Sequence, residues 1–166
     1  AGSNVAVGTY SLDANTTGYS NIAIGSHSLG ANTTGYLNTA VGYAALDAST
    51  TAYTNTAFGA YALGAVVVNV NNTATGYNAL AANTTYNNTA VGAYCCDVST
   101  TGANNAVVGQ SAMHAHTTGD NNAALGMNAL LASTTGAQNV AVGNLAGNTT
   151  TTGTYNIYIG YNASAV

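Results

Sequence analysis

Residues 38–54 read NTAVGYAALDASTTAYT, and variants of this phrase fill the 166-residue chain. The phrase recurs every 17 residues, except between Gly76 and Gly92, where the step is 16. A fixed short period is the sequence signature of a solenoid, in which each repeat forms one coil and stacks on its neighbours. Seventeen residues are too few for a helical hairpin but suffice for two short strands and two turns. We therefore expect an all-β, parallel β-solenoid (β-roll) with ten coils, forming a single array over residues 1–166.

Two positions of the phrase hold the same residue in every copy, a glycine and, four residues before it, an asparagine. Equivalent residues of stacked coils lie about 4.8 Å apart, so the asparagines can form an amide ladder that fixes the register. The glycine should mark a corner that needs a positive φ or a close backbone approach. The predicted structural ladder comprises Asn4, Asn21, Asn38, Asn55, Asn72, Asn88, Asn105, Asn122, Asn139 and Asn156 with Gly8, Gly25, Gly42, Gly59, Gly76, Gly92, Gly109, Gly126, Gly143 and Gly160.

Two neighbouring columns precede the glycine, one mainly alanine (as at Ala40) and one mainly β-branched (as at Val41). Adjacent strand residues face opposite ways, so only one column can point inward. We expect the larger column inside and the alanines outside, where small side chains would let a second chain approach. A third column, four residues after the glycine, should complete the core: Leu12, Leu29, Leu46, Leu63, Leu80, Cys96, Met113 and Leu130, with a lapse at Gly147.

The composition excludes several function classes. The chain has no Lys or Arg and only four acidic residues. Nucleic-acid binding depends largely on Lys and Arg, and attraction to anionic membranes does too, so we expect neither partner. No apolar run is long enough to cross a bilayer, so we expect no membrane insertion. Stacking explains part of this composition, because a charge fixed in the repeat would form a column of like charges.

The phrases at residues 22–29 and 140–143 resemble the repeat of YadA-like trimeric autotransporter heads. The N-T-A-V-G-Y-x-A-L copies are also similar to repeats of bacteriophage tail-fibre proteins. The resemblance covers almost the whole chain. It implies a left-handed parallel β-roll with short coils, usually with three chains side by side.

Few residues could support chemistry. Asp13, Asp47 and Asp97 share one column, and His114 follows Asp97 in the next coil, where we expect a solvated surface pair. His114 and His116 would lie on one face of a strand, as a metal site requires, but no third ligand is near. A regular solenoid is expected to have no cleft. We therefore expect no enzymatic activity, no metal and no cofactor.

Cys95 and Cys96 are adjacent and fall at apolar positions of the repeat. Adjacent cysteines rarely bridge each other, and free cysteine packs like a small hydrophobic residue. We expect both thiols to belong to the core rather than to a redox site.

Tyr19, Tyr36 and Tyr53 occupy one column of three successive coils and should form a ribbon of stacked rings. Exposed aromatic rings can bind the faces of sugars or a partner chain, which makes these residues a candidate surface-binding site. The alternative is that the rings only cover a turn and stabilise the stack.

A file of threonines raises a rival function, since regular Thr arrays on uncharged flat solenoids resemble the ice-binding surfaces of antifreeze proteins. Two features of the file count against this function: its threonines come as adjacent pairs rather than with a Thr-x-Thr spacing, and Val67 and Val68 interrupt it. The file is Thr16, Thr33, Thr50, Thr84, Thr100, Thr117, Thr134 and Thr151.

The interpretation favoured by the sequence is a structural segment of an extracellular fibre or filament, of the adhesin or phage tail-fibre type. Neither end carries a cap, as expected of a segment of a longer fibre or of subunits stacked end to end. The expected partner is the chain itself, as a side-by-side homotrimer or an end-to-end filament, with a cell-surface glycan or receptor as a possible second partner. The alternative is an ice-binding or glycan-binding solenoid that uses its Thr or Tyr files.

Overall fold

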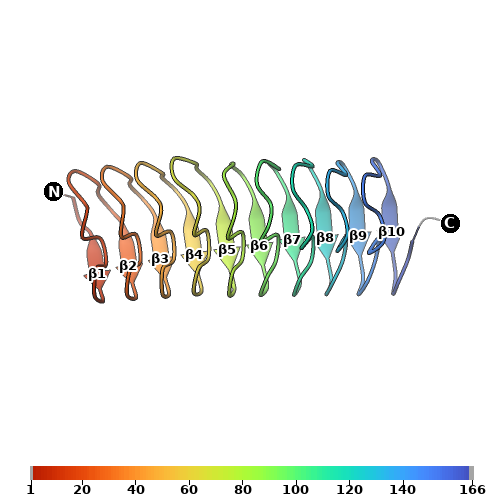
Figure 1. The fold of residues 1–166 in the computed structure, drawn as a ribbon, viewed down its shortest axis with the longest axis horizontal. Coiled ribbons are helices and arrows are strands. Elements are labelled where there is room, and N and C mark those ends of the chain that lie inside the picture. Colours follow the sequence, from red (N-terminus) through yellow and green to blue (C-terminus); the bar gives the residue numbers. More distant parts are fainter. Residues whose placement is uncertain (1, 165–166) are drawn as a thin grey trace.

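The computed structural model describes residues 2–164, which form a β-solenoid whose coils follow one another along a straight axis (Figure 1). Ten strands join side by side in one parallel sheet, in the order of the sequence. The strands are β1 (Val5–Val7), β2 (Ile22–Ile24), β3 (Thr39–Val41), β4 (Thr56–Phe58), β5 (Thr73–Thr75), β6 (Thr89–Val91), β7 (Ala106–Val108), β8 (Ala123–Leu125), β9 (Val140–Val142) and β10 (Ile157–Ile159). The all-β parallel solenoid expected from the period is confirmed.

The register places equivalent positions of the repeat beside one another at every step of the sheet. Ala23 pairs with Ala40, and Ala40 with Ala57. The 16-residue step leaves this register intact, because Thr73 of β5 still pairs with Thr89 of β6. The missing residue is absorbed in the turn before β6, where the Thr85 hydroxyl donates to the Gly102 carbonyl at 2.6 Å.

The alanine column points into the coil, and the larger column points out. Ala23 and Ala40 are fully buried, whereas Val7 and Phe58 are each 56% exposed. The expectation that the β-branched column fills the core is therefore wrong. Each strand has only three residues, and side chains alternate between its faces, so only the central residue points inward.

The core is narrow, which explains why the central strand residue is small. Leu29, Leu46 and Leu63 of the third column are fully buried, and so are the alanines that precede the last two, Ala45 and Ala62. The leucines have φ values near 50°, in the left-handed region that makes a corner. A corner this tight leaves room for little more than a methyl group from the strand.

The last coil shows that core volume decides which residue fits. Tyr158 takes the place of the strand alanine and is only 5% exposed. It fits because Gly147 replaces the leucine, and a Cβ added at Gly147 would lie 2.7 Å from Cδ2 of Tyr158. The large and small residues have exchanged positions, so the interior stays filled.

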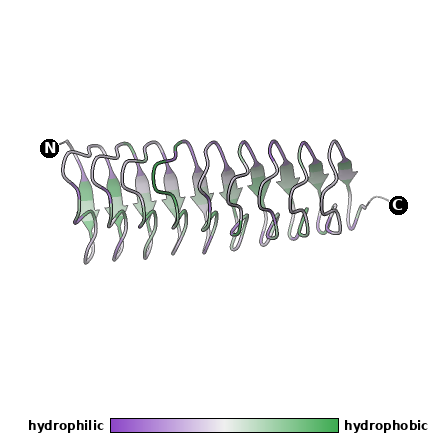
Figure 2. Cartoon of the chain, turned by 45° about the horizontal axis from the view of Figure 1, so that its top comes forward, coloured by the Kyte–Doolittle hydropathy of each residue, from purple (hydrophilic) through white to green (hydrophobic). Residues whose placement is uncertain are grey.

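The outer face of the sheet carries two columns of side chains, the first and last residues of each strand. Exposed members include Ile22, Ile24, Val108 and Leu125, and β1 and β2 are largely green in Figure 2. Association between chains through an alanine-rich outer face, as expected from the sequence, is excluded because those alanines are buried inside their own coil. The apolar surface on the sheet is formed by the Val, Ile and Leu side chains instead.

Candidate functional site

The asparagine column forms a continuous hydrogen-bonded ladder. The Oδ1 atom of Asn21 accepts from both the backbone N–H and the Nδ2 of Asn38, at 3.0 and 3.2 Å. The second Nδ2 proton of Asn38 goes to the Ala52 carbonyl at 2.8 Å. The same backbone contact occurs at all nine steps from Asn4 to Asn156.

The amide-to-amide bond is missing at the first step, between Asn4 and Asn21, and at the 16-residue step. There, Asn88 directs its Nδ2 to Thr85, Asn83 and Gly102 instead of Asn72. The ladder thus satisfies buried polar groups even where the repeat is irregular.

The glycine column makes the corner predicted for it, and both suggested reasons apply. Gly42 has a φ of 137°, which side-chain-bearing residues rarely adopt. A Cβ on Gly42 would also lie 2.6 Å from the carbonyl carbon of Gly59 in the next coil. The corner therefore requires glycine for its conformation and for its contact.

Tyr19, Tyr36 and Tyr53 form the ribbon of stacked rings expected from their column. The ring centroids are 4.9 and 4.8 Å apart, and the planes differ by 6° and 1°. The column continues with Val70, which pairs with Tyr53 through a parallel bridge. Tyr19 and Tyr53 are 45% and 37% exposed, and binding of a ligand through the stacked rings stays a prediction.

The hydroxyls of the threonine file are committed to the solenoid itself. Thr16 donates its Oγ1 to the Thr33 carbonyl at 2.9 Å, and Thr33 donates to Thr50 at 3.0 Å. A hydroxyl that donates to the next coil is less free to order water or bind a ligand. The geometry therefore assigns this file a role in holding coils together.

The two histidines of the His-Ala-His segment lie in different environments. His114 is exposed and its Nδ1 lies 2.5 Å from Oδ1 of Asp97, which is the expected surface pair. His116 is fully buried, with Nδ1 3.4 Å from the Ser99 hydroxyl. The expectation of two imidazoles on one strand face is wrong, because none of residues 114–116 lies in a strand.

Burial also determines the protonation of His116. Desolvation lowers its pKa to about 4, although the Gly119 backbone and Asp120 act in the opposite direction. The imidazole is therefore neutral at neutral pH. Within residues 2–164, no group of three or more His, Cys, Asp or Glu side chains is arranged to hold a metal ion.

Cys95 and Cys96 are both free and buried, as predicted for core residues. The neighbouring Cys95 thiol and burial raise the pKa of Cys96 well above its ordinary value. A thiol that is buried and protonated is a poor nucleophile.

A second row of aromatic rings runs along the first six coils, and sequence analysis missed it. Consecutive ring centroids are 5.0, 6.0, 5.3, 6.1 and 5.3 Å apart. The row was missed because its members are divided between the first and second positions after the conserved glycine. Reading these two positions together would have revealed it. We call it the aromatic row, and its members are Tyr10, His27, Tyr43, Tyr61, Tyr77 and Tyr94.

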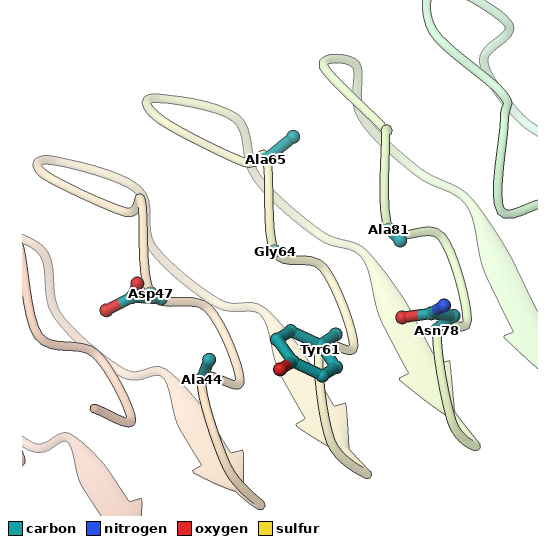
Figure 3. Close-up of a pocket in the computed structure, with 7 residues that line it drawn as sticks. All are labelled: Ala44, Asp47, Tyr61, Gly64, Ala65, Asn78 and Ala81. Carbon is teal, nitrogen blue, oxygen red and sulfur yellow. The ribbon is translucent and has the colours of Figure 1, made fainter. Parts of the chain in front are cut away.

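The centre of the aromatic row borders a hollow of about 340 Å³ (Figure 3). The expectation that a regular solenoid has no cleft is wrong here, because the repeat is locally irregular. Desolvation and the neighbouring phenols of Tyr43 and Tyr77 raise the pKa of Tyr61, which borders this hollow. The lining residues are Ala44, Asp47, Tyr61, Gly64, Ala65, Asn78 and Ala81.

No helix in the described part of the chain has the length and apolar character to span a bilayer. No protein-family model, curated protein or solved structure matches the sequence. What can be inferred about function therefore depends on the repeat and on the geometry of its surfaces.

Proposed function

We propose that this chain is a structural segment of an extracellular fibre or filament, of the adhesin or tail-fibre type, which supplies stiffness and surface attachment. The observation that carries the proposal is the unbroken asparagine ladder, whose nine steps repeat the same contact from β1 to β10. A repeated contact of this kind resists bending and local opening, because each coil is held by both neighbours. Stiffness is the property that a fibre requires.

The outer face of the sheet supports association between chains. Its two columns contain no charged or amide side chain in any of the ten strands. An uncharged face of this length, apolar except for five threonines in β3 to β6, is uncommon on a monomer and is typical of a protein–protein contact. Side-by-side association would cover it, as a trimer or a larger bundle.

Electron microscopy and light scattering of the purified protein test this proposal. We expect elongated particles whose mass exceeds that of one chain, and Leu125→Glu should reduce that mass because it places a charge on the apolar face. Val68→Glu is the matched control, since Val68 is 57% exposed but lies in a turn away from the sheet. Discrete single chains of the native protein at every concentration would rule out the fibre.

Ice binding remains a second candidate because of one specific observation on the same face. The outward positions of β5 read Thr73-x-Thr75, the spacing that the threonine file lacks, and those of β3 and β6 read Thr39-x-Val41 and Thr89-x-Val91. These side chains lie on the sheet and not in a turn. Strong thermal hysteresis that is lost in Thr73→Lys would favour ice binding over the fibre.

A further inference from the structure

The hollow beside Tyr61 exists because small residues occupy positions where other coils carry larger ones. Gly64 stands in the column that holds Asp13, Asp97, His114 and Leu131 elsewhere. Ala44 and Ala81 are the small neighbours on either side. The recess therefore depends on small residues of three successive coils, Ala44, Gly64 and Ala81.

An aromatic ring and an amide border the recess. Tyr61 is 42% exposed, and in Figure 3 its ring lies beside Ala44 while the Asn78 side chain extends from the next coil towards the Tyr61 side. The Asn78 side chain carries an amide that can both donate and accept hydrogen bonds. Asp47 forms the far wall, with its carboxylate turned towards the preceding coil, where Oδ1 lies close to Gly30.

The charge of the chain restricts what the recess can hold. The sequence has no Lys or Arg, and its formal net charge is −4. A phosphate, sulfate or carboxylate group would find no cation, so anionic ligands are disfavoured. The walls are mainly alanine and tyrosine, and the one carboxylate faces away, so a cation would find no direct partner either.

We propose that the recess beside Tyr61 binds one residue of a neutral glycan that lies along the aromatic row. The apolar C–H face of the sugar would pack on the Tyr61 ring, and the sugar hydroxyls would hydrogen-bond to the Asn78 amide and the Tyr61 hydroxyl. Tyr43 and Tyr77, whose centroids are 5.3 and 6.1 Å from that of Tyr61 and whose planes are tilted from it by 78° and 86°, place further aromatic rings on both sides for the neighbouring sugars. All residues of this site belong to one chain, so a single solenoid would have the site whether or not it forms a fibre. The inference therefore does not depend on the proposed function.

Saturation-transfer NMR and calorimetry with neutral linear tetrasaccharides of glucose, galactose, mannose and N-acetylglucosamine test the site. At least one of them should bind, and Tyr61→Ala should weaken its binding by about tenfold or more. Gly64→Leu should abolish binding by filling the recess. The backbone should accept this leucine because Leu131 occupies the equivalent position four coils further along.

Asp13→Leu is the matched control, because it places a leucine in the same column away from the recess, and Tyr61→Phe should retain most of the affinity. The circular dichroism spectrum and melting temperature of each variant show whether it folds. The proposal is overturned if none of the four glycans binds at millimolar concentration, if folded Gly64→Leu binds as well as the native chain, or if tetramethylammonium displaces the sugar. These outcomes concern glycan binding alone. The fibre proposal is tested separately, by the length and mass of the particles, so the failure of one proposal can be told from the failure of the other.

Discussion

At the scale of single residues, the solenoid depends on positions where only one side chain fits. Gly42 is such a position, because its φ of 137° and the backbone of Gly59 both exclude a Cβ. Gly64 is different: a Cβ there would lie 3.3 Å from the Tyr61 carbonyl, and its φ is not in the left-handed region. Gly42 therefore cannot be replaced without strain, whereas Gly64 can accept a side chain.

Gly42→Ala should destabilise the protein by about 2 kcal/mol or more, because the added methyl group forces the corner and the next coil apart. Gly64→Ala should change stability by less than about 1 kcal/mol. Urea unfolding followed by circular dichroism measures both values. Equal losses in the two variants would show that the corner does not require glycine.

Burial of His116 predicts a dependence of stability on pH. Its pKa is about 4 in the folded chain against an ordinary value of 6.5, so the unfolded chain binds the proton more readily. Above about pH 6.5 this difference in pKa does not affect the free energy of unfolding. As the pH drops towards 4, the free energy of unfolding falls by up to about 1.4 kcal/mol per pH unit, and below pH 4 this effect adds no further loss. His116→Asn, which introduces the residue found at Asn32 and Asn83 of the same column, should remove this dependence.

Unfolding free energies of the native chain and His116→Asn, measured at several pH values between 4 and 7 in one buffer system, check this prediction. The difference between the two proteins should change between pH 4 and about 6.5 and stay constant from there to pH 7. A constant difference would mean that His116 titrates normally in the folded state.

At the scale of the coil, core volume is shared between the strand and the corner that faces it. Most coils combine a small strand residue with a large corner residue, as in Ala141 with Leu130. The last coil reverses the two sizes, with Tyr158 inside the strand against Gly147. This exchange predicts that the two positions are energetically coupled.

Tyr158→Ala should cost about 3 kcal/mol or more by leaving a cavity, and Gly147→Leu should be destabilising because the leucine would meet the tyrosine ring. The double variant restores the usual arrangement and should recover much of the loss, since the φ of Gly147 is 62°, near the values of the column leucines. A double-mutant cycle of unfolding free energies measures the coupling. Additive losses would show that the two side chains do not share one space.

At the scale of the whole molecule, each coil contacts only the coil before and the coil after it. Strand contacts occur between sequence neighbours alone, from β1 to β10. Stability in such an array is approximately the sum of the coils and their interfaces. Damage at one coil should therefore spread only to its neighbours.

Asn55→Ala tests this locality, because Asn55 donates to Asn38 and Asn69 and accepts from Asn72. Its loss leaves buried partners unsatisfied and should cost about 3 kcal/mol. Amide hydrogen exchange should accelerate in the coils that hold β3 to β5 and remain slow in β8 and β9. Uniform acceleration along the chain would indicate one cooperative unit, and Gln110→Ala, at an exposed side chain, serves as the control.

Much of the architecture could be predicted from the sequence, because it depends on translation along the axis. A strict period places Asn38 next to Asn21 and Gly42 next to Gly25, whatever the shape of the coil. The ladder, the register, the leucine column and the position of the deletion all follow from this repetition. The tyrosine stack follows for the same reason, since its three rings share one column.

The tertiary structure alone decided how the coil closes across its width. A three-residue strand can bury either its central or its outer residues, and only the tight leucine corner determines that Ala40 points inward and Val41 outward. The same closure buries His116 while leaving His114 in solvent, and it brings Tyr61 beside the space above Gly64. These features depend on residues that face one another across the coil, and the period of a sequence holds no information about that direction.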